Sequence, residues 1–421
     1  MGYYPGINWL DSLPPWDGNN FSPLEVPRQI LKELGNPQDA YPSVHIAGTN
    51  GKGSVSNFIS SILQAQSRDN FVGLLTSPHI LCVSERARLN GKNASLEEIS
   101  DSLVEVRKVC EKCNISPTYF VAITVATFLL FRILKVNYAV IEVGLGGRFD
   151  VTNLLSKPLL TVITSISFDH QAHLGSTLKE IAWNKAGIAK NLVPMLFSSS
   201  IAEEAKSEII KECEIVGSPV IEGRDDERFG KLFHKYSYQY KNAMLAAQAA
   251  LLLGCDESAI KKGLSGTKVT GRLQYFSPSE DSDIRSGILL DAAHNAEGVR
   301  ELFRFVSGFL SESNFSSLTI VCNFLSRKDW KASLDELRRS LRGISTGFNF
   351  AYYSLEHKGG VPIDDLIYEL GHGRIYRNHQ DLLIHESQFD NRLIVCFGSF
   401  YVVSDFLTLL SESKSCNFNT L

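Results

Sequence analysis

A glycine-rich segment that carries one lysine and one serine follows a short apolar run near the start of the chain. It reads AGTNGKGS over residues 47–54, directly after Val44-His45-Ile46, and it opens a helical pattern. Glycines let backbone N–H groups approach a ligand closely, and a helix N-terminus adds a partial positive charge to the full charge of Lys52. This context predicts a polyphosphate-binding loop in which the Ser54 hydroxyl ligates magnesium.

The loop departs from the usual pattern G-x-x-x-x-G-K-[ST], because Gly53 stands between Lys52 and Ser54. We therefore assign it to a variant class of phosphate-binding loop. The alternative, a glycine-rich turn that binds nothing, does not explain a lysine and a serine in register. The residues expected to contact the nucleotide phosphates are Thr49, Asn50, Gly51, Lys52, Gly53 and Ser54.

Polar side chains also follow three later strand-like runs. Ser77 follows the run 72–75, Glu142 follows 138–141, and His170 comes after 159–163, with Lys185 on the next helical pattern. Ligands gather at the carboxyl ends of parallel strands, so these side chains are expected around one phosphate pocket. Magnesium prefers oxygen ligands, which favours Ser54 and Glu142; His170 is equally well interpreted as a hydrogen-bonded loop histidine.

Two segments imitate other nucleotide sites. Residues 142–150, EVGLGGRFD, follow a strand but lack the third glycine of G-x-G-x-x-G, which disfavours a nicotinamide dinucleotide site. Asn184-Lys185-Ala186 begins like the guanine-reading N-K-x-D motif, yet Gly187 occupies the aspartate position, which disfavours a GTP switch.

Short apolar runs alternate with longer helical patterns along the whole chain, which predicts an α/β fold with a mainly parallel sheet. Helical periodicity is found over 96–113, 122–134, 201–215 and 240–253. We expect an ATP-binding domain over residues 1–275, a polar linker over 277–283, and a smaller α/β domain over 284–421 with strands at 287–290, 318–322, 348–353 and 393–397. The serine-rich tail after Leu410 is expected to fray.

Composition excludes several classes of protein. The 421 residues carry a net charge of −4 and are 44% hydrophobic, which argues against nucleic-acid binding as the main function. The longest apolar run, 120–131, is too short to span a bilayer, so no membrane association is expected. Only Cys110 and Cys113 lie close together, and we interpret them as half-buried thiols of a reduced cytoplasmic protein.

Six ordered motifs between about residues 30 and 300 resemble the folylpolyglutamate synthase/dihydrofolate synthase family of the Mur ligase superfamily. They are GTNGKGS, TSPHI with ERARLNG, EVGLGGRFDVTN, DHQAHLGSTLKEIAWNKAGI, GRLQ at 271–274 and DAAHN at 291–295. The resemblance implies a P-loop Mur-ligase-type central domain and a smaller Rossmann-like α/β C-terminal domain. Cell-wall Mur ligases are disfavoured, because they carry a nucleotide-sugar domain before the loop and only 47 residues precede Gly48.

The resemblance implies an ATP-dependent ligase that adds L-glutamate to dihydropteroate, to a folate, or to both. The γ-phosphate of ATP would activate the carboxylate as an acyl phosphate, and the glutamate amine would displace phosphate. Lys52 and Mg²⁺ would neutralise the repulsion between anionic reactants. A monomer is expected. The non-enzymatic alternative is a regulator that binds ATP without ligase turnover.

The resemblance also implies a role for individual residues. Lys52, Lys185 and His170 would be catalytic, with Lys185 carbamylated so that an anionic oxygen replaces its cation. The metal ligands would be Ser54, Ser77, Glu142, His170 and Lys185. Asn242 would contact adenine, and Arg272 and Asp291 would reach ATP from the interdomain side, with His294 a weaker candidate in the same cleft. Solvent exposure or helix capping is the ordinary alternative for each.

The pterin end of the substrate would lie near the residues Thr118, Tyr119, Phe120, Phe149 and Asp150, through aromatic stacking and a carboxylate. Three positions depart from the family pattern. Val121 and Asn184 stand where glutamate is usual, and Ala292 replaces a glycine.

Overall fold

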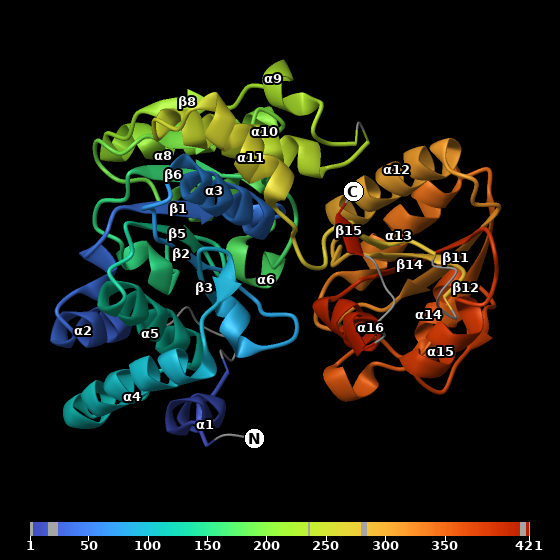
Figure 1. Ribbon diagram of the computed structural model, residues 1–421, viewed down its shortest axis with the longest axis horizontal. Coiled ribbons are helices and arrows are strands. Elements are labelled where there is room, and N and C mark those ends of the chain that lie inside the picture. Colours follow the sequence, from blue (N-terminus) through green and yellow to red (C-terminus); the bar gives the residue numbers. More distant parts are fainter. Residues whose placement is uncertain (1–2, 16–23, 235, 279–283, 413–417, 421) are drawn as a thin grey trace. The chain divides into compact units, whose positions relative to one another are not determined.

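The computed structural model describes residues 3–15, 24–234, 236–278, 284–412 and 418–420. The chain forms two compact units (Figure 1). The first unit comprises Met1–Leu232 and Lys241–Thr267, and the second comprises Phe233–Tyr240 and Lys268–Leu421.

The division of the chain differs from the expected one, which placed residues 1–275 in the first domain. Strand β9 (Gln274–Phe276) pairs antiparallel with β10 (Gly287–Leu290), so residues 268–275 belong to the second unit. Residues 233–240 join that unit as well. The expected linker, 277–283, lies outside the described residues from 279 onward. Pairing between distant segments, which local composition does not reveal, sets the boundary.

The described residues of the first unit contain a sheet with the strand order β4-β3-β2-β5-β1-β6-β7-β8. Along the order from β2 to β8 every pairing is parallel, and the antiparallel pairings of this sheet are β2 with β3 and β3 with β4. The carboxyl ends of β2, β5, β1 and β6 therefore meet at one edge, which confirms the mainly parallel α/β fold. The strands are β1 (Ser43–Ala47), β2 (Val72–Leu75), β3 (Ala87–Leu89), β4 (Lys92–Asn93), β5 (Tyr138–Glu142), β6 (Leu160–Ile163), β7 (Met195–Phe197) and β8 (Val220–Glu222).

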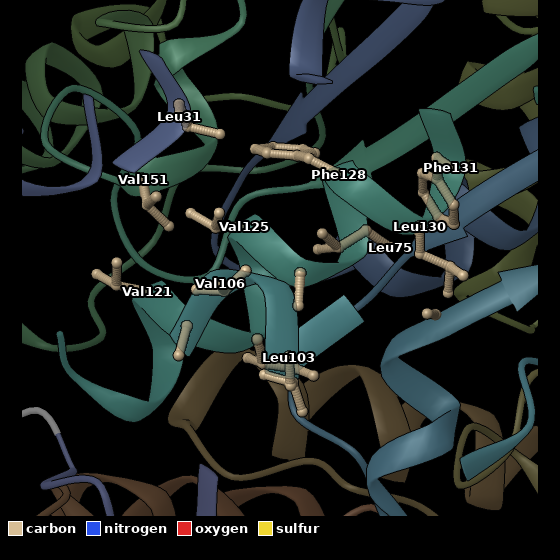
Figure 2. Close-up of a cluster of buried hydrophobic side chains, with 14 of the residues drawn as sticks. Leu31, Leu75, Leu103, Val106, Val121, Val125, Phe128, Leu130, Phe131 and Val151 are labelled. Carbon is tan, nitrogen blue, oxygen red and sulfur yellow. The ribbon is translucent and has the colours of Figure 1, made fainter. Parts of the chain in front are cut away.

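The helices of this unit include one, α5, that is apolar on all sides and accordingly buried. Figure 2 shows its Val121, Val125 and Phe128 among the core side chains, together with Leu103 of α4 and Leu75 of β2. The α-helices are α1 (Pro5–Ser12), α2 (Glu25–Glu33), α3 (Lys52–Gln66), α4 (Leu96–Cys113), α5 (Tyr119–Ile133), α6 (Gln171–Leu174), α7 (Leu178–Ala186), α8 (Glu203–Val216), α9 (Glu227–Gly230), α10 (Gln239–Leu252) and α11 (Glu257–Gly266).

The second unit is a smaller α/β unit, as expected, with the strand order β13-β12-β11-β14-β10-β9-β15 in its described residues. The strands from β13 to β10 pair in parallel. Its remaining elements are β11 (Ser317–Cys322), β12 (Gly347–Tyr352), β13 (Arg374–Ile375), β14 (Arg392–Phe397), β15 (Phe418–Thr420), α12 (Ala296–Glu312), α13 (Trp330–Leu341), α14 (Ile363–Leu370), α15 (His379–Glu386) and α16 (Phe400–Glu412). The expectation of a frayed tail is wrong for residues 418–420, which pair with β9.

Within the described residues, no helix combines the length and the apolar character needed to cross a bilayer.

Candidate active site

The glycine-rich segment is the loop that joins β1 to α3, as the sequence predicts. Gly48 and Gly51 adopt φ angles of 149° and 85°. A Cβ at Gly48 would overlap the Thr164 hydroxyl, and one at Gly51 would overlap the Asn242 side-chain oxygen. Both positions therefore require glycine, for conformation and for space.

The segment that follows β6 fixes the shape of this loop. The backbone N–H of Thr49 donates to the Ser165 carbonyl at 2.8 Å, and that of Asn50 donates to Ser165 Oγ at 2.9 Å. Thr164 Oγ1 donates to the Asn50 carbonyl at 2.6 Å. The loop is held by its neighbour before any ligand binds, which reduces the entropic cost of binding.

Two lysine ammonium groups converge on one carbonyl of the loop. Lys52 Nζ lies 3.1 Å from the Gly48 oxygen, and Lys185 Nζ, from α7, lies 2.8 Å from the same oxygen. Lys185 is 3% exposed, so it is not the surface lysine that a helical position alone would suggest. The two cations concentrate positive charge where a polyphosphate would bind.

Glu142 and Ser54 are the two buried oxygen-bearing side chains that the sequence predicts as magnesium ligands beside the loop. Glu142 ends β5, is buried, and accepts the Ser77 backbone N–H at 3.0 Å. A Cβ at Gly53 would lie 3.6 Å from both of its carboxylate oxygens. Ser54 Oγ is buried and has no hydrogen-bond partner among the described residues. A carboxylate beside an unpaired hydroxyl fits a Mg²⁺ ion that also binds nucleotide phosphates.

The position of His170 does not identify it as a metal ligand. It is the first residue before α6, has a φ of 51°, and its Nε2 lies 3.8 Å from Asp169 Oδ2. No group of three His, Cys, Asp or Glu residues in the described part of the chain is arranged to hold a metal. Glu142, Asp169 and His170 are therefore no preformed cluster, and the role of His170 as a ligand stays a prediction.

Asn242, the residue expected to read adenine, lies on α10 against the loop, as the overlap with a Cβ at Gly51 shows. Its position beside the phosphate loop is compatible with contact to the nucleotide.

The residues expected at the pterin end divide into two places. The first is the start of α5, where the Thr118 hydroxyl caps the helix by accepting the Val121 N–H at 3.5 Å. The Tyr119 ring lies 5.6 Å from the Arg86 guanidinium carbon. Phe120 lies against Gly144, where a Cβ would overlap its ring.

The second place is the loop after β5. Phe149 is 39% exposed, and its ring centre lies 6.1 Å from that of Trp183. Asp150 is buried instead, and its carboxylate accepts N–H donors of Leu145 and Thr152 at 2.9 Å each. Burial raises the pKa of Asp150 although these bonds oppose the rise. The carboxylate thus stabilises its own loop, and Phe149 is the exposed member of the pair.

Three predicted residues of the second unit gather after β10. Asp291 is buried and accepts hydrogen bonds from Tyr238 Oη at 2.5 Å and from the N–H groups of Leu273 and Ala293 at 2.8 Å. Burial raises the pKa of Asp291. The rings of His294 and Phe400 lie 6.0 Å apart, and the Arg272 guanidinium lies 4.9 Å from the same Phe400 ring. The sequence-predicted set Arg272, Asp291 and His294 is therefore one local cluster.

Two half-buried arginines near Glu142 were not singled out from the sequence. Arg86 Nε donates to His79 Nδ1 at 2.9 Å, and Arg88 Nη1 donates to Asn57 Oδ1 at 2.9 Å. Burial lowers the pKa of both guanidinium groups, and the nearby Glu142 carboxylate opposes that shift. The two arginines of the motif ERARLNG were the only sign in the sequence that could have pointed to this pair.

The departures from the family pattern have local explanations at two positions. Val121 is 4% exposed in the core of Figure 2, where an apolar side chain needs no polar partner. Asn184 is buried beside Gly146, where a Cβ would overlap its side-chain oxygen. Nothing in the structure explains Ala292.

Comparison with known proteins agrees with this geometry. Residues 46–222 match the Mur ligase middle domain. A dihydrofolate synthetase of Saccharomyces cerevisiae is 31% identical over 421 residues, which cover 90% of this chain and 96% of the relative. A dihydrofolate synthase/folylpolyglutamate synthase of Bacillus subtilis is 31% identical over 415 residues, which cover 90% of this chain and 92% of the relative.

Solved structures extend the likeness to the fold. The crystal structure of a bifunctional folylpolyglutamate synthase/dihydrofolate synthase with Mn, AMPPNP and L-glutamate bound is 25% identical and has a TM-score of 0.81. The similarity covers 97% of this chain and 98% of that one.

Proposed function

The chain belongs to the family of dihydrofolate and folylpolyglutamate synthases, and from this membership we propose that it is an ATP-dependent ligase that joins L-glutamate to dihydropteroate, to a reduced folate, or to both. The acceptor carboxylate is a poor electrophile, so it needs a leaving group before an amine can attack. ATP supplies that group by phosphorylating the carboxylate, and the glutamate amine then expels phosphate.

The observation that carries this proposal is the arrangement around the loop of β1 and α3. Lys52 and Lys185 both reach the Gly48 carbonyl, the Ser54 hydroxyl is buried without a partner among the described residues, and a Cβ at the preceding Gly53 would lie 3.6 Å from the Glu142 carboxylate. The loop N–H groups and Lys52 hold the β- and γ-phosphates. Ser54 and Glu142 hold Mg²⁺, which lowers the repulsion between the phosphate and the incoming carboxylate.

Lys185 has a second part in the proposal. A carbamate on its Nζ would convert a buried cation into an anionic oxygen ligand beside the loop, where a metal ion is available to stabilise it. Ser77 and His170 complete the proposed set of metal ligands. On the acceptor side, Phe120 and Phe149 offer aromatic surface to the pterin ring.

The experiment that tests the ligase activity measures phosphate release by the purified protein with ATP and Mg²⁺. Dihydropteroate and tetrahydrofolate are supplied in turn, each with and without L-glutamate. Release that requires both an acceptor and glutamate is expected, with oxygen-18 passing from the acceptor carboxylate into inorganic phosphate. Tight ATP binding without acceptor-dependent release would instead identify a nucleotide-binding regulator.

We also propose a monomer that works in a reducing compartment such as the cytoplasm. Every cysteine in the described part of the chain is a free thiol, which supports that setting.

A further inference from the structure

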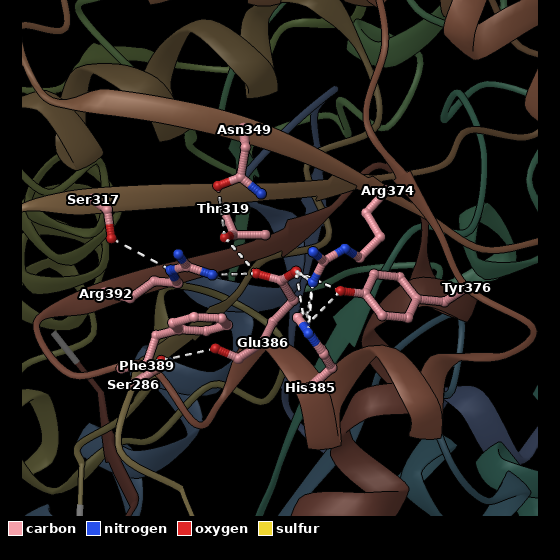
Figure 3. A network of polar contacts seen from close by, with 10 residues as sticks. All are labelled: Ser286, Ser317, Thr319, Asn349, Arg374, Tyr376, His385, Glu386, Phe389 and Arg392. Atoms are coloured by element: carbon pink, nitrogen blue, oxygen red, sulfur yellow. Dashed lines mark hydrogen bonds and ion pairs between the residues drawn. The ribbon is translucent and has the colours of Figure 1, made fainter.

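The second unit contains a cavity of about 500 Å³, and none of its lining residues belongs to the site proposed for the ligase reaction. Figure 3 shows the polar network on its wall. The lining residues are Asn349, Phe350, Gly373, Arg374, Glu386, Phe389 and Arg392.

The cavity lies towards the β13 edge of the sheet, away from Asp291. Asn349 and Phe350 belong to β12 and Arg374 to β13, whereas Asp291 follows β10, and β11 and β14 stand between β12 and β10. Arg392 is the first residue of β14, four residues before Cys396, the partner of Leu290 at the end of β10. The cavity is therefore a place of its own in the second unit, away from Arg272, Asp291 and His294.

The carboxylate in the wall is already neutralised. Glu386 is 2% exposed and accepts hydrogen bonds from Arg392 Nη1 at 2.5 Å, Thr319 Oγ1 at 3.0 Å and Tyr376 Oη at 2.5 Å. Burial alone would raise the pKa of Glu386, but these donors hold it below its usual range. Glu386 therefore remains an anion that balances Arg392.

Arg374 provides the surplus positive charge. Its side chain is 54% exposed, and its Nη1 lies 4.0 Å from Glu386 Oε1, while Nη1 is 2.8 Å from His385 Nδ1. With Arg392 paired to Glu386, the lining carries one net positive charge. A guanidinium has five N–H donors in a planar fork that matches a carboxylate, so an anion that enters the cavity has a partner.

The other walls are flat and apolar. Phe350 is buried below the cavity, and Phe389 is 40% exposed beside it. The Arg392 guanidinium already stacks on the Phe389 ring, 3.9 Å from its centre. Such walls favour a planar ligand group over a flexible or strongly hydrated one.

We propose that this cavity is a second ligand site of the protein and that it takes an aromatic carboxylate. The carboxylate pairs with Arg374, and the ring lies against Phe350 and Phe389. One surplus charge matches a singly charged carboxylate better than a phosphate, which brings up to two negative charges and needs more donors.

The test is a calorimetric titration of the full chain with benzoate, acetate and phenyl phosphate. Benzoate is expected to bind at least about tenfold more tightly than acetate, because of ring burial, and more tightly than phenyl phosphate. Arg374→Gln is expected to weaken benzoate binding at least about tenfold. The matched control, Arg377→Gln, changes an exposed arginine close to Arg374 in sequence and is expected to bind benzoate like the parent.

Phe389→Ala separates the ring contact from the charge, because it should reduce benzoate binding and leave the weak acetate binding unchanged. Circular dichroism establishes that each variant is folded. The proposal is wrong if the parent does not bind benzoate, if Arg374→Gln binds it like the parent, or if phenyl phosphate binds more tightly. These measurements use no ATP or glutamate, so they stand apart from the ligase assay.

Discussion

Lys185 is a buried lysine beside the phosphate loop. Its side chain is 3% exposed, and its Nζ lies 2.8 Å from the Gly48 carbonyl oxygen. A cation is costly to bury without polar partners, so this position constrains the ammonium group closely. In the proposed mechanism, Lys185 sets the charge of the phosphate loop, either as a cation or, once carbamylated, as an oxygen ligand.

Replacement of Lys185 tests this role. Lys185→Ala is expected to lower turnover at least about 100-fold while ATP still binds, because the loop is held separately by residues 164–167. Short-chain carboxylates should restore part of the activity by supplying the missing oxygen. Lys179→Ala, an exposed lysine on the same helix, is the control and should retain parent activity. Equal turnover in parent and Lys185→Ala would remove Lys185 from the mechanism.

Burial of a single histidine, His45, makes the stability of the protein depend on pH. It lies in β1 and is fully buried, its Nε2 is 2.9 Å from Thr152 Oγ1, and burial lowers its pKa from 6.5 to about 3. The unfolded chain binds the proton more readily. The neutral imidazole therefore contributes its full stability above about pH 6.5, and this contribution is lost as the pH falls towards 3.

The free energy of unfolding should accordingly fall by about 1 kcal/mol between pH 6.5 and pH 5.5 from this residue alone. Urea unfolding at about pH 6.5 and about pH 5.5 measures the slope, and comparison with a His45 variant separates the contribution of His45 from that of the other titrating groups. His45→Gln should flatten that slope whatever its effect on absolute stability. His357→Gln, at an exposed histidine, should leave the slope unchanged. A slope that is the same in parent and His45→Gln would contradict the assignment.

At the scale of elements, Gly51 in the loop between β1 and α3 has a matched control in Gly254, which lies between α10 and α11. Gly51 and Gly254 adopt almost the same φ, 85° and 83°, yet only Gly51 has a side chain, that of Asn242, where a Cβ would stand. This pair separates backbone strain from displacement of the neighbour.

Gly254→Ala should cost about 1–2 kcal/mol of stability from left-handed backbone strain and leave nucleotide affinity unchanged. Gly51→Ala should carry the same strain, displace Asn242 and weaken ATP binding at least about tenfold, since both the loop and the adenine contact shift. Calorimetric titration with AMPPNP measures the affinity of both variants. An unchanged affinity in Gly51→Ala would mean that Asn242 has no part in the nucleotide site.

Elements with local signals were the ones that sequence patterns predicted well. Helix α4 has the predicted bounds, because Ser95 and Glu98 form a capping box at its start and Asn114 ends it in the left-handed conformation. Strands β2 and β10 also have the predicted bounds. The sequence also predicted that the loop, Ser77 and Glu142 lie at one edge of the sheet. Parallel strands place their carboxyl ends together, so residues that follow such strands meet there.

Other features depend on contacts between distant residues, which periodicity does not encode. The burial of Asp150 results from a loop that folds back on its carboxylate, and the burial of Lys185 results from the approach of α7 to the phosphate loop. The pairing of β15 with β9 joins segments about 140 residues apart, so the end of the chain was expected to fray. The same reason explains the misplaced domain boundary.

At the scale of the whole molecule, the chain enters the second unit at 233–240, returns to the first, and enters the second again at 268. Two tyrosine side chains of the segment 233–240 contact the rest of the second unit. Tyr238 donates to the buried Asp291, and Tyr236 lies flat on α12, where a Cβ at Gly308 would overlap its ring. Tyr236 and Tyr238 thus pack against the core of the second unit.

Substitution of Gly308 tests how much this segment contributes to the stability of the second unit. In an exposed helix interior, a change from glycine to alanine stabilises by about 1 kcal/mol, but here the added methyl group must displace Tyr236. Loss of a packed aromatic ring costs more than the helix gains, so Gly308→Ala is expected to destabilise the second unit by about 1–3 kcal/mol. Chemical denaturation, followed for each unit separately, measures the change. In a Tyr236→Ala background the same substitution should instead stabilise, because the clash is gone. Destabilisation of equal size in both backgrounds would show that residues 233–240 do not cover α12.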